Sequence, residues 1–404
     1  MQSDFDVVIA GAGLVGAALA LGLSRLGLQV LVVDKLPPPG AAHGPGISPE
    51  GSDPRGLALS LSSVAVLEAL QVWSRLASLV YPIKHIHVTQ QGHFGALRLS
   101  HRDLDLPTLG VVCPAEALQR ALVVALEDAP GISLHWTTRL TACNSEREAL
   151  QISLVTSTQP TSCTTSLLIG ADGIDSQVRE FAGIETQRHA YGQTAIVANV
   201  DVGCPRANTA FERFTTSGPL ALLPIGGRRH VLVRTAHSAD LAELLALTDA
   251  AYLVDARQRF GHTLGAWSNL GPRRAHPLVL QRAARLIGAR CMLLGNAANT
   301  VHPNAAQGLN LGFRDVAAAL TIIENAQRAG EDLGSTPVLR RYAAARAGDQ
   351  HSTTRITDTL ARVFALESPV FGSLRALAML AVDRLPPVKR AILRRLVLGQ
   401  GFMA

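Results

Sequence analysis

The chain has 404 residues, of which 48% are hydrophobic and 17% charged, a composition that excludes a disordered protein and indicates an ordered globular one. Its formal net charge of +6 is accompanied by few aromatic residues, which argues against a nucleic-acid-binding protein. The cysteines have no C-x-x-C spacing, so reduced thiols are expected and neither a disulfide framework nor a metal site is predicted.

The sequence gives no sign of a membrane-spanning or secreted protein. No uninterrupted apolar run approaches the roughly 20 residues that a transmembrane helix needs. Asp4 and Asp6 stand where a secretory signal peptide would be basic. We therefore expect a cytoplasmic protein, either free in solution or peripheral at the inner face of the cytoplasmic membrane.

The chain begins with a β-branched segment at 5–10, which predicts a buried strand, followed by a glycine-rich turn and a helix. A second predicted strand at 29–33 ends at Asp34. The turn has the pattern G-x-G-x-x-G, and its glycines are Gly11, Gly13 and Gly16. In this strand–turn–helix context the pattern predicts dinucleotide binding, with Asp34 facing a ribose hydroxyl. The alternative is a tight glycine turn that binds no ligand.

Residues 37–54 are rich in Pro, Gly and Ser, which predicts a loop. The segment 53–60 closes this loop and is expected to lead into a helix that continues to Val72. Arg55 lies in the closing segment, where its guanidinium would face a phosphate or an aromatic ring, or would be an ordinary solvated charge.

Another strand predicted at 167–170 also ends in glycine and an acid, here Asp172-Gly173. Asp172 would accept a hydrogen bond from a ribityl hydroxyl, and Gly173 would leave room for the ligand. The alternative is that Asp172 caps the N-terminus of the following helix.

A different pattern separates these nucleotide-type segments. Residues 86–99 and 191–235 alternate as antiparallel strands do, and a helix at 239–260 and a strand at 277–281 follow. This block interrupts the α/β pattern, so we expect a second domain laid over the first.

Residues 293–315 begin as an apolar strand and end as an amphipathic helix, with small residues, His302-Pro303 and a Gly-Leu-Asn-Leu-Gly run between them. A helix start has free backbone N–H groups and favours electron-rich or anionic ligand atoms. The small side chains let a flat ligand approach the backbone closely. This segment therefore predicts a ligand-binding loop.

The end of the chain is predicted to be helical. Val388, Ile392 and Leu396 fall on one side of the last helix, and basic residues fall on the other. This pattern is typical of a helix that lies in a membrane interface. A helix packed on its own domain, with a solvated basic face, explains it equally well.

The three nucleotide-type segments, 11–16, 172–173 and 295–312, together resemble the FAD-dependent aromatic hydroxylases typified by p-hydroxybenzoate hydroxylase. Within that family the chain resembles the ubiquinone-biosynthesis branch, of the UbiH type. The stretches that carry this second resemblance are 87–95, 191–200, 210–215, 218–224 and 307–312. The likeness extends over nearly the whole chain.

The resemblance implies an α/β fold, with a Rossmann-like FAD-binding domain, an inserted substrate domain with a mixed or antiparallel sheet, and a helical C-terminus. The expected FAD-binding domain comprises 1–75, 110–185 and 285–335. The expected substrate domain comprises 76–109 and 186–284, and the helical region 336–404.

The same resemblance implies the roles of individual residues. The ADP half of FAD would be held by Gly11, Gly13, Gly16 and Asp34. The pyrophosphate, ribityl chain and flavin ring would contact Arg55, Asp172, Gly173, Asn296, Pro303, Gly308, Leu309, Asn310 and Leu311. The wider family has Asp where this chain has Asn296, which keeps an acceptor oxygen but loses the charge. His302 is a weak candidate for an acid or base and is better explained by packing or hydrogen bonding, so no catalytic residue is assigned.

The expected reaction is hydroxylation of a polyprenylated phenol in ubiquinone biosynthesis, with FAD as cofactor, NAD(P)H as electron donor and O2 as co-substrate; the 2-polyprenyl-6-methoxyphenol step fits best. The alternatives are another ring position, a soluble aromatic substrate, or a non-catalytic scaffold subunit. A flavin halogenase is disfavoured because its Trp-x-Trp-x-Ile-Pro motif is absent. The tryptophans of this chain, Trp73, Trp136 and Trp267, are far apart in the sequence. Other ubiquinone-biosynthesis proteins and the membrane surface are candidate partners, and nucleic acid is not.

Overall fold

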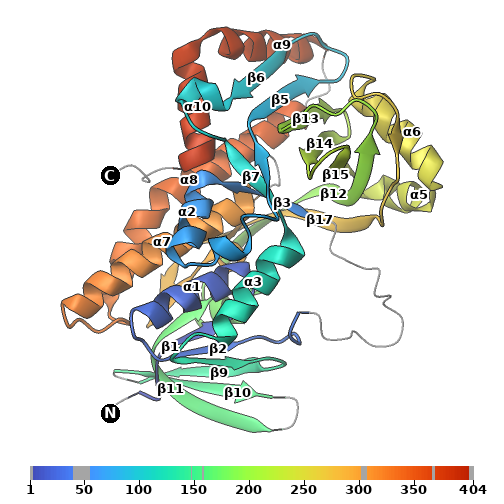
Figure 1. The fold of residues 1–404 in the computed structure, drawn as a ribbon. Coiled ribbons are helices and arrows are strands. Elements are labelled where there is room, and N and C mark those ends of the chain that lie inside the picture. The colour runs from blue at the N-terminus through green and yellow to red at the C-terminus, as the bar shows by residue number, and fades with distance from the viewer. Residues whose placement is uncertain are drawn as a thin grey trace.

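The computed structural model describes residues 3–39, 55–146, 148–156, 159–301, 307–365 and 369–399. A largely parallel sheet lies at one end of the molecule, a mixed sheet and the C-terminal helices lie at the other, and helices fill the space between them (Figure 1).

The parallel sheet has the strand order β18-β19-β11-β1-β2-β8. Its strands are β1 (Phe5–Ala10), β2 (Val30–Val33), β8 (Ile132–His135), β11 (Pro160–Gly170), β18 (Ile287–Gly288) and β19 (Cys291–Leu293). Strand β10 (Leu150–Val155) extends it through antiparallel pairing with β11, and β9 (Arg139–Ser145) pairs antiparallel with β10. Because β19, β11, β1 and β2 are parallel neighbours, their carboxyl ends meet at one edge, where the predicted nucleotide segments begin.

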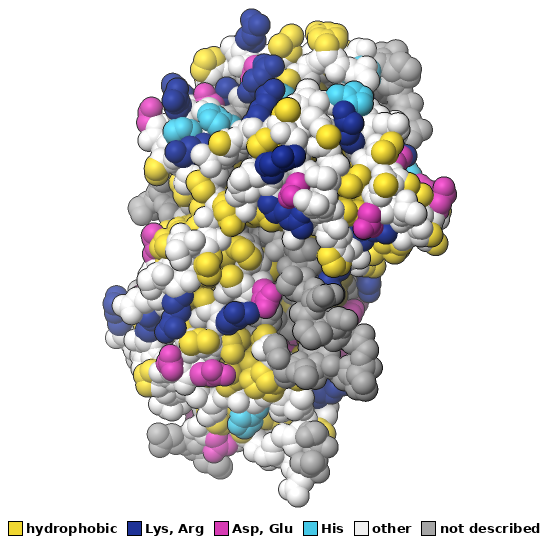
Figure 2. All heavy atoms as spheres, turned by 45° about the vertical axis from the view of Figure 1, so that its right-hand side comes forward, with side chains coloured by type: hydrophobic (Ala, Val, Ile, Leu, Met, Phe, Trp, Pro, Cys, Tyr) yellow, Lys and Arg dark blue, Asp and Glu magenta, His cyan; other side chains and the backbone are white. Residues whose placement is uncertain are grey.

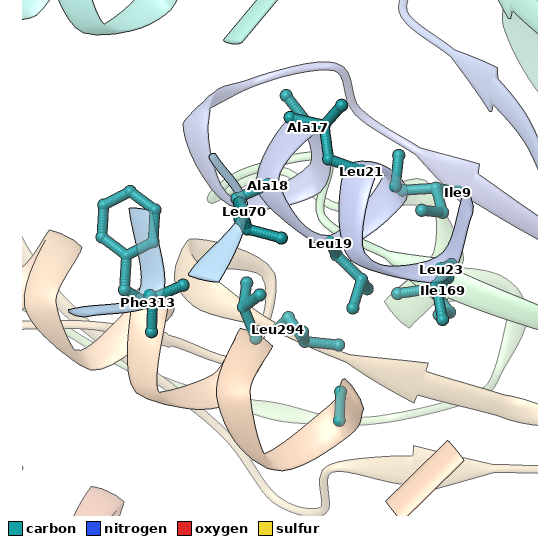
Figure 3. Close-up of a cluster of buried hydrophobic side chains, with 14 of the residues drawn as sticks. Ile9, Ala17, Ala18, Leu19, Leu21, Leu23, Leu70, Ile169, Leu294 and Phe313 are labelled. Atoms are coloured by element: carbon teal, nitrogen blue, oxygen red, sulfur yellow. The ribbon is translucent and has the colours of Figure 1, made fainter. Parts of the chain in front are cut away.

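A layer of helices covers one face of this sheet and contains the largest core (Figure 3). Its helices are α1 (Leu14–Arg25), α2 (Leu61–Ala69), α3 (Ala115–Glu127) and α7 (Gln307–Arg328). Leu19 of α1, Ile169 of β11 and Phe313 of α7 are all fully buried there. Helices α1 and α7 approach so closely that a Cβ on Gly22 would lie 2.4 Å from Leu320 Cδ1. The short helix α4 (Gln177–Phe181) follows β11.

A small sheet corrects one sequence expectation. Residues 53–60 were expected to lead directly into a helix that continues to Val72, but 56–60 form a strand and the helix spans only 61–69. The sheet consists of β3 (Gly56–Ser60), β4 (Tyr81–Ile83) and β7 (Gly110–Pro114). Strand β3 pairs with a segment about 50 residues away, and a local pattern does not contain such long-range hydrogen bonds.

The mixed sheet has the order β20-β17-β12-β15-β14-β13-β5-β6, with β16 beside β12. Its strands are β5 (His85–Gln90), β6 (Ala96–Ser100), β12 (Thr186–Val202), β13 (Thr209–Thr215), β14 (Gly218–Pro224), β15 (Arg229–His237), β16 (Trp267–Ser268), β17 (Arg274–Ala283) and β20 (Asn299–Thr300). All pairs are antiparallel except β13 with β5. Strand β20 belongs to the third nucleotide-type segment, so that segment is hydrogen-bonded to the mixed sheet.

One face of the mixed sheet packs against α5 (Leu241–Ala246) and α6 (Asp249–Phe260). The sequence predicted one helix over 239–260, but the structure has two. The break lies at 247–248, where Leu247 leaves the helical conformation and the Thr248 side chain caps α6 by accepting a hydrogen bond from Ala251 N.

The C-terminal region is helical, as predicted. Helix α8 (Thr336–Ala365) packs along α7, α9 (Pro369–Arg384) lies on β6, and α10 (Pro386–Leu398) follows. None of the helices in the described ranges is both long and apolar enough to cross a bilayer. The predicted fold class is confirmed, and the division into domains at the expected residue limits stays a proposal.

Candidate functional site

The three nucleotide-type segments come together at the start of α1. A Cβ on Gly11 would lie 2.4 Å from the carbonyl oxygen of Ala171, so the first and second segments are in direct backbone contact. Cβ atoms on Gly295 and Gly312, in the third segment, would both lie close to the Val15 side chain. The fold therefore joins segments that are up to 300 residues apart at the N-terminal end of one helix.

The glycine turn satisfies both requirements of a nucleotide-binding motif. A Cβ on Gly16 would lie 1.9 Å from Gly11 O, so only glycine allows the turn to close so tightly. By contrast, no atom lies within 4 Å of the Cβ position of Gly13. The turn is packed from behind and open in front, which is the geometry that lets a phosphate approach the helix N-terminus.

A pocket of about 210 Å³ lies at the carboxyl ends of β1 and β2. It is lined by Gly11, Gly13, Asp34, Lys35, Thr138, Asp172, Gly173 and neighbouring residues. Five predicted site residues, namely Gly11, Gly13, Asp34, Asp172 and Gly173, thus share one cavity.

Asp34 holds the turn in place. Its Oδ2 accepts a hydrogen bond from Ala12 N at 2.8 Å, and its Oδ1 accepts one from Leu36 N at 2.8 Å. A carboxylate has about four lone-pair positions, so Asp34 can still accept from a ribose hydroxyl. The side chain is therefore fixed before any ligand arrives.

Asp172 combines the two interpretations that the sequence left open. Its Oδ2 accepts hydrogen bonds from Gln177 N at 2.7 Å and Val178 N at 3.2 Å, which caps the start of α4. Its Oδ1 is buried and has no hydrogen-bond partner within the described ranges. Because a buried carboxylate oxygen is costly to leave unpaired, Oδ1 is a natural acceptor for a ligand hydroxyl.

The third segment contributes a short helix, η4 (Gly295–Ala297), and the start of α7. Asn296 is exposed in η4. Gly308 and Leu309 are partly exposed in the first turn of α7, whereas Asn310 and Leu311 are buried. The predicted contacts of His302 and Pro303 lie outside the described residues.

The Asn310 side chain fastens α7 to the small sheet. Its Oδ1 accepts hydrogen bonds from Ser60 N at 2.9 Å and Ser63 Oγ at 2.7 Å, and its Nδ2 donates to Ala58 O at 3.0 Å. Its side chain is thus engaged within the protein, and its predicted contact with the flavin stays a prediction. Arg55 is exposed immediately before β3, and its carbonyl accepts from Ala115 N.

Sequence reasoning missed a set of buried residues on α8 that hold the third segment. Tyr342, Arg346 and Gln350 are spaced four apart, so they share one face of the helix. Tyr342 OH donates to Leu293 O at 3.0 Å, Arg346 Nε donates to Asp315 Oδ1 at 2.6 Å, and Gln350 Oε1 accepts from Asn299 Nδ2 at 2.6 Å. We call these three residues the α8 clamp.

Asp315 links the clamp to η4. Its Oδ2 accepts from Gly295 N at 3.0 Å, and its Oδ1 also accepts from Gln350 Nε2 at 3.0 Å. The side chains of Asp315 and Arg346 are 1% and 4% exposed, so the ion pair lies in the protein interior. The sequence signal that could have revealed the α8 clamp is its spacing. Polar groups recur every four residues along a long helix, on a face where apolar side chains are expected.

Burial and charge set the protonation states within this network. Burial lowers the pKa of Arg346, but Asp315 and Asp349 outweigh that effect and raise it. Burial raises the pKa of Tyr342 well above its ordinary value, so the phenol stays protonated and donates to Leu293 O. The clamp is therefore locked in one charge state over the whole physiological pH range.

Comparison with known proteins agrees with this geometry. Residues 4–350 match the family described as the FAD binding domain. The chain belongs to this family. It is 35% identical over 389 residues to the ubiquinone hydroxylase UbiL of Rhodospirillum rubrum, covering 96% of this chain and 88% of that protein. It is also 31% identical over 390 residues to the 3-demethoxyubiquinol 3-hydroxylase of Escherichia coli, covering 96% and 97%.

The fold has solved counterparts as well. The p-nitrophenol 4-monooxygenase PnpA of Pseudomonas putida superposes with a TM-score of 0.77 at 18% identity, covering 97% of both chains. This likeness concerns the fold; the family match and the two hydroxylase relatives show that the protein is an FAD-dependent aromatic hydroxylase. The residues present fit FAD: the open front of Gly13, the shared pocket and the unpaired buried oxygen of Asp172 are features that a dinucleotide would fill.

Proposed function

We propose that this protein hydroxylates the ring of a polyprenylated phenol in ubiquinone biosynthesis, with FAD as cofactor, NAD(P)H as electron donor and O2 as co-substrate. The observation that carries this proposal is the end-to-end match to two hydroxylases whose names refer to ubiquinone or its precursor. Bound FAD would supply the activated oxygen that no side chain can supply. The protein would hold the cofactor, orient the phenol and exclude water.

We propose the following cofactor contacts. The turn at Gly11, Gly13 and Gly16 holds the pyrophosphate, and Asp34 accepts from the ribose. The free oxygen of Asp172 accepts from a hydroxyl of the cofactor, and Gly173 leaves space beside it. The exposed amide of Asn296 faces the ribityl chain. The first turn of α7, from Gly308 to Leu311, directs its backbone N–H groups and its positive dipole end at the flavin ring.

The substrate would lie on the face of the mixed sheet that is opposite to α6. That face is turned toward β3, because a Cβ on Gly56 would lie 2.8 Å from the Val231 side chain. Asn310 in turn holds β3 against the start of α7, beside the proposed position of the flavin ring. We call this face of the mixed sheet the substrate wall. It is mainly apolar, which suits an aromatic ring and the first carbons of a prenyl tail.

One carboxylate stands in this wall. Val197, Val233, Ala221 and Glu212 are successive cross-strand partners, so their side chains lie on the same face of the sheet. We assign to Glu212 a hydrogen bond from the phenol hydroxyl, which would raise the electron density of the ring at the carbon to be hydroxylated. The role needs no metal and no second base.

A deletion strain tests the proposed function. Its lipid extract should lack ubiquinone and accumulate a polyprenylated phenol, and the mass and fragmentation of that phenol identify the missing hydroxyl. Accumulation of 2-polyprenyl-6-methoxyphenol supports that step, whereas demethoxyubiquinol assigns the protein to another ring position. A normal quinone pool would overturn the proposal. Complementation by a variant that cannot bind FAD would indicate a scaffold subunit.

A further inference from the structure

Helix α9 has an apolar surface on its outward side. Its inward side, with Gly372, Ala376 and Met379, is buried against the β5–β6 hairpin. Its outward side is formed by Leu374, Leu377, Ala378, Ala381 and the following Leu385, all of which are exposed. Leu374 is 55% exposed and Leu377 51%, so this helix is apolar on both sides. An apolar helix face that none of the described residues covers marks an interaction site.

Two neighbouring residues enlarge this surface. Phe94 at the tip of the β5–β6 hairpin is 71% exposed. The next residue, Gly95, packs so tightly on α9 that a Cβ there would lie 2.4 Å from Ala376 O. Val388, at the start of α10, is also exposed. We call Phe94, Leu374, Leu377, Leu385 and Val388 the α9 surface.

The charge around the α9 surface is strongly positive. Residues 369–399 contain six Lys or Arg and one Asp, so they carry a net charge of +5, out of +6 for the whole chain. The single acid, Asp383, is only 13% exposed and lies 3.7 Å from Arg98 and 3.9 Å from Lys389. Figure 2 shows basic and hydrophobic side chains together at the top of the molecule, where Figure 1 places α9.

The sequence left two interpretations of the last helix open: a membrane-interface helix with Val388, Ile392 and Leu396 on its apolar side, or a helix packed on its own domain. In the structure, α10 uses most of its apolar side to pack on its own protein. Leu393 and Val397 are 0% and 2% exposed, and Leu396 packs against the same cluster. Helix α10 therefore contributes mainly cations, and α9 contributes the apolar face.

We propose that the α9 surface docks on a lipid bilayer that contains anionic phospholipid. Large apolar side chains would enter the interface, and the surrounding Arg and Lys residues would attract the lipid head groups. This inference rests on the proposed function, because a polyprenylated phenol is dissolved in the bilayer and has to leave it to reach the site. The hairpin that meets α9 continues through β5 into the mixed sheet, next to Glu212 on β13. The hairpin that supports the docking surface and the strand that carries Glu212 thus belong to one continuous sheet.

Vesicle flotation with the FAD-loaded full-length protein tests this proposal. We expect binding to vesicles of phosphatidylcholine with phosphatidylglycerol, weak binding to phosphatidylcholine alone, and release by high salt. The double variant Leu374→Ser/Leu377→Ser should bind the anionic vesicles roughly tenfold less tightly. The matched control is Val254→Ser on α6, which removes a 56% exposed apolar side chain far from α9 and should leave binding unchanged.

Three results would overturn the proposal. The first is absence of wild-type binding to anionic vesicles. The second is equal binding by the double variant and by wild type. The third is a change of oligomeric state in the double variant with unchanged vesicle binding, which would assign the α9 surface to a protein partner. Turnover of a short-tailed phenol in solution tests the proposed function separately, because it needs no membrane, and the double variant should retain it.

Discussion

At the scale of single residues, Asn310 and Asn296 have different roles near the proposed flavin site. Asn310 is buried and forms three hydrogen bonds that join α7 to β3 and α2. Asn296 is exposed in η4, and within the part of the chain that the structure describes its side chain has no hydrogen-bond partner, while its backbone carbonyl accepts from Thr300 Oγ1. One residue therefore serves the fold and the other is available to a ligand.

Replacing each asparagine by alanine should separate these tasks. We expect Asn310→Ala to lower the free energy of unfolding by about 2 kcal/mol, because Ser60 N is then buried without an acceptor. Asn296→Ala should change it by less than about 0.5 kcal/mol and weaken FAD binding instead. Chemical denaturation of the apoprotein and titration of FAD fluorescence measure the two effects. An Asn296→Ala protein with unchanged FAD affinity would contradict the assigned contact.

Glu212 is the residue on which the substrate assignment can be tested. We expect Glu212→Leu to lower kcat by about tenfold, because the phenol hydroxyl loses its acceptor. Glu212→Gln keeps an acceptor oxygen and should retain more of the activity, with a changed pH profile. The FAD dissociation constant is the control and should stay the same in both variants. An unchanged kcat for Glu212→Leu would remove Glu212 from the reaction.

At the scale of elements, α8 determines the position of the loop that carries Asn296. The α8 clamp contacts Leu293 and Asn299 directly, and Arg346 acts on Gly295 through the side chain of Asp315. Because η4 itself is only three residues long, its conformation depends on these contacts. The C-terminal region thus supports the loop that carries Asn296.

Loosening the clamp should weaken FAD binding. Gln350→Met removes the hydrogen bonds to Asp315 and Asn299, and we expect the FAD dissociation constant to rise roughly fivefold, or about 1 kcal/mol. Amide hydrogen exchange within 293–299 should become faster in the apoprotein. Arg341→Gln on the same helix is the control, since it removes only a half-exposed ion pair with Glu331. Equal effects of the two variants would show that α8 acts through general stability.

The ion pairs of α8 also predict a dependence on pH. Burial alone would raise the pKa of Asp349, but Arg314 and Arg346 lower it below its ordinary value of 3.8. A carboxylate with a lower pKa in the folded state stabilises that state above the unfolded-state pKa and loses this effect as the pH falls through the folded-state pKa. We therefore expect this part of the stability to be constant from neutral pH down to about 4 and to be lost below it.

Asp349→Asn should remove this acid-dependent part of the stability. The variant should also be about 3 kcal/mol less stable at neutral pH, because two buried guanidinium groups lose their shared carboxylate. The melting temperature measured between pH 3 and 7, for wild type and variant, gives both quantities. Parallel curves for the two proteins over the acidic range would contradict the assignment.

At the scale of the whole molecule, FAD is expected to connect parts that lie far apart in the sequence. Its proposed contacts come from the start, the middle and the last third of the chain, and all of them meet at α1. Ligand binding to a site of this kind should stabilise the molecule as a unit and not one element alone.

FAD should therefore raise the global stability of the protein. At a free FAD concentration of about 100 times the dissociation constant, the free energy of unfolding should rise by about 2.7 kcal/mol. Hydrogen exchange should slow at the ends of β1, β11 and β19 together. Slower exchange confined to the β1–α1–β2 unit would show that the other two segments do not contribute to binding.

Local patterns were sufficient for much of the fold. Residues 5–10 were predicted as a strand and form β1, and the alternation at 96–99 lies within β6. The single helix over 239–260 and the helix expected to continue from 53–60 to Val72 were wrong, because a cap at Thr248 and the long-range pairing of β3 overrode the local pattern. The family and its cofactor followed from the order of the three glycine-containing segments, and the comparisons confirm both.

The sequence by itself indicated the three glycine-containing segments that meet at the start of α1, because backbone access at a helix N-terminus requires glycine at defined spacings. Tertiary structure alone decided what each polar side chain does. It turned Asn310 toward β3, divided the oxygens of Asp172 between a helix cap and the pocket, and set the α8 clamp against η4. These roles depend on hydrogen bonds between residues remote in sequence, and burial makes such bonds obligatory only once the chain has folded. The outward apolar face of α9 arose in the same way, since packing on the hairpin selects which side of the helix remains exposed.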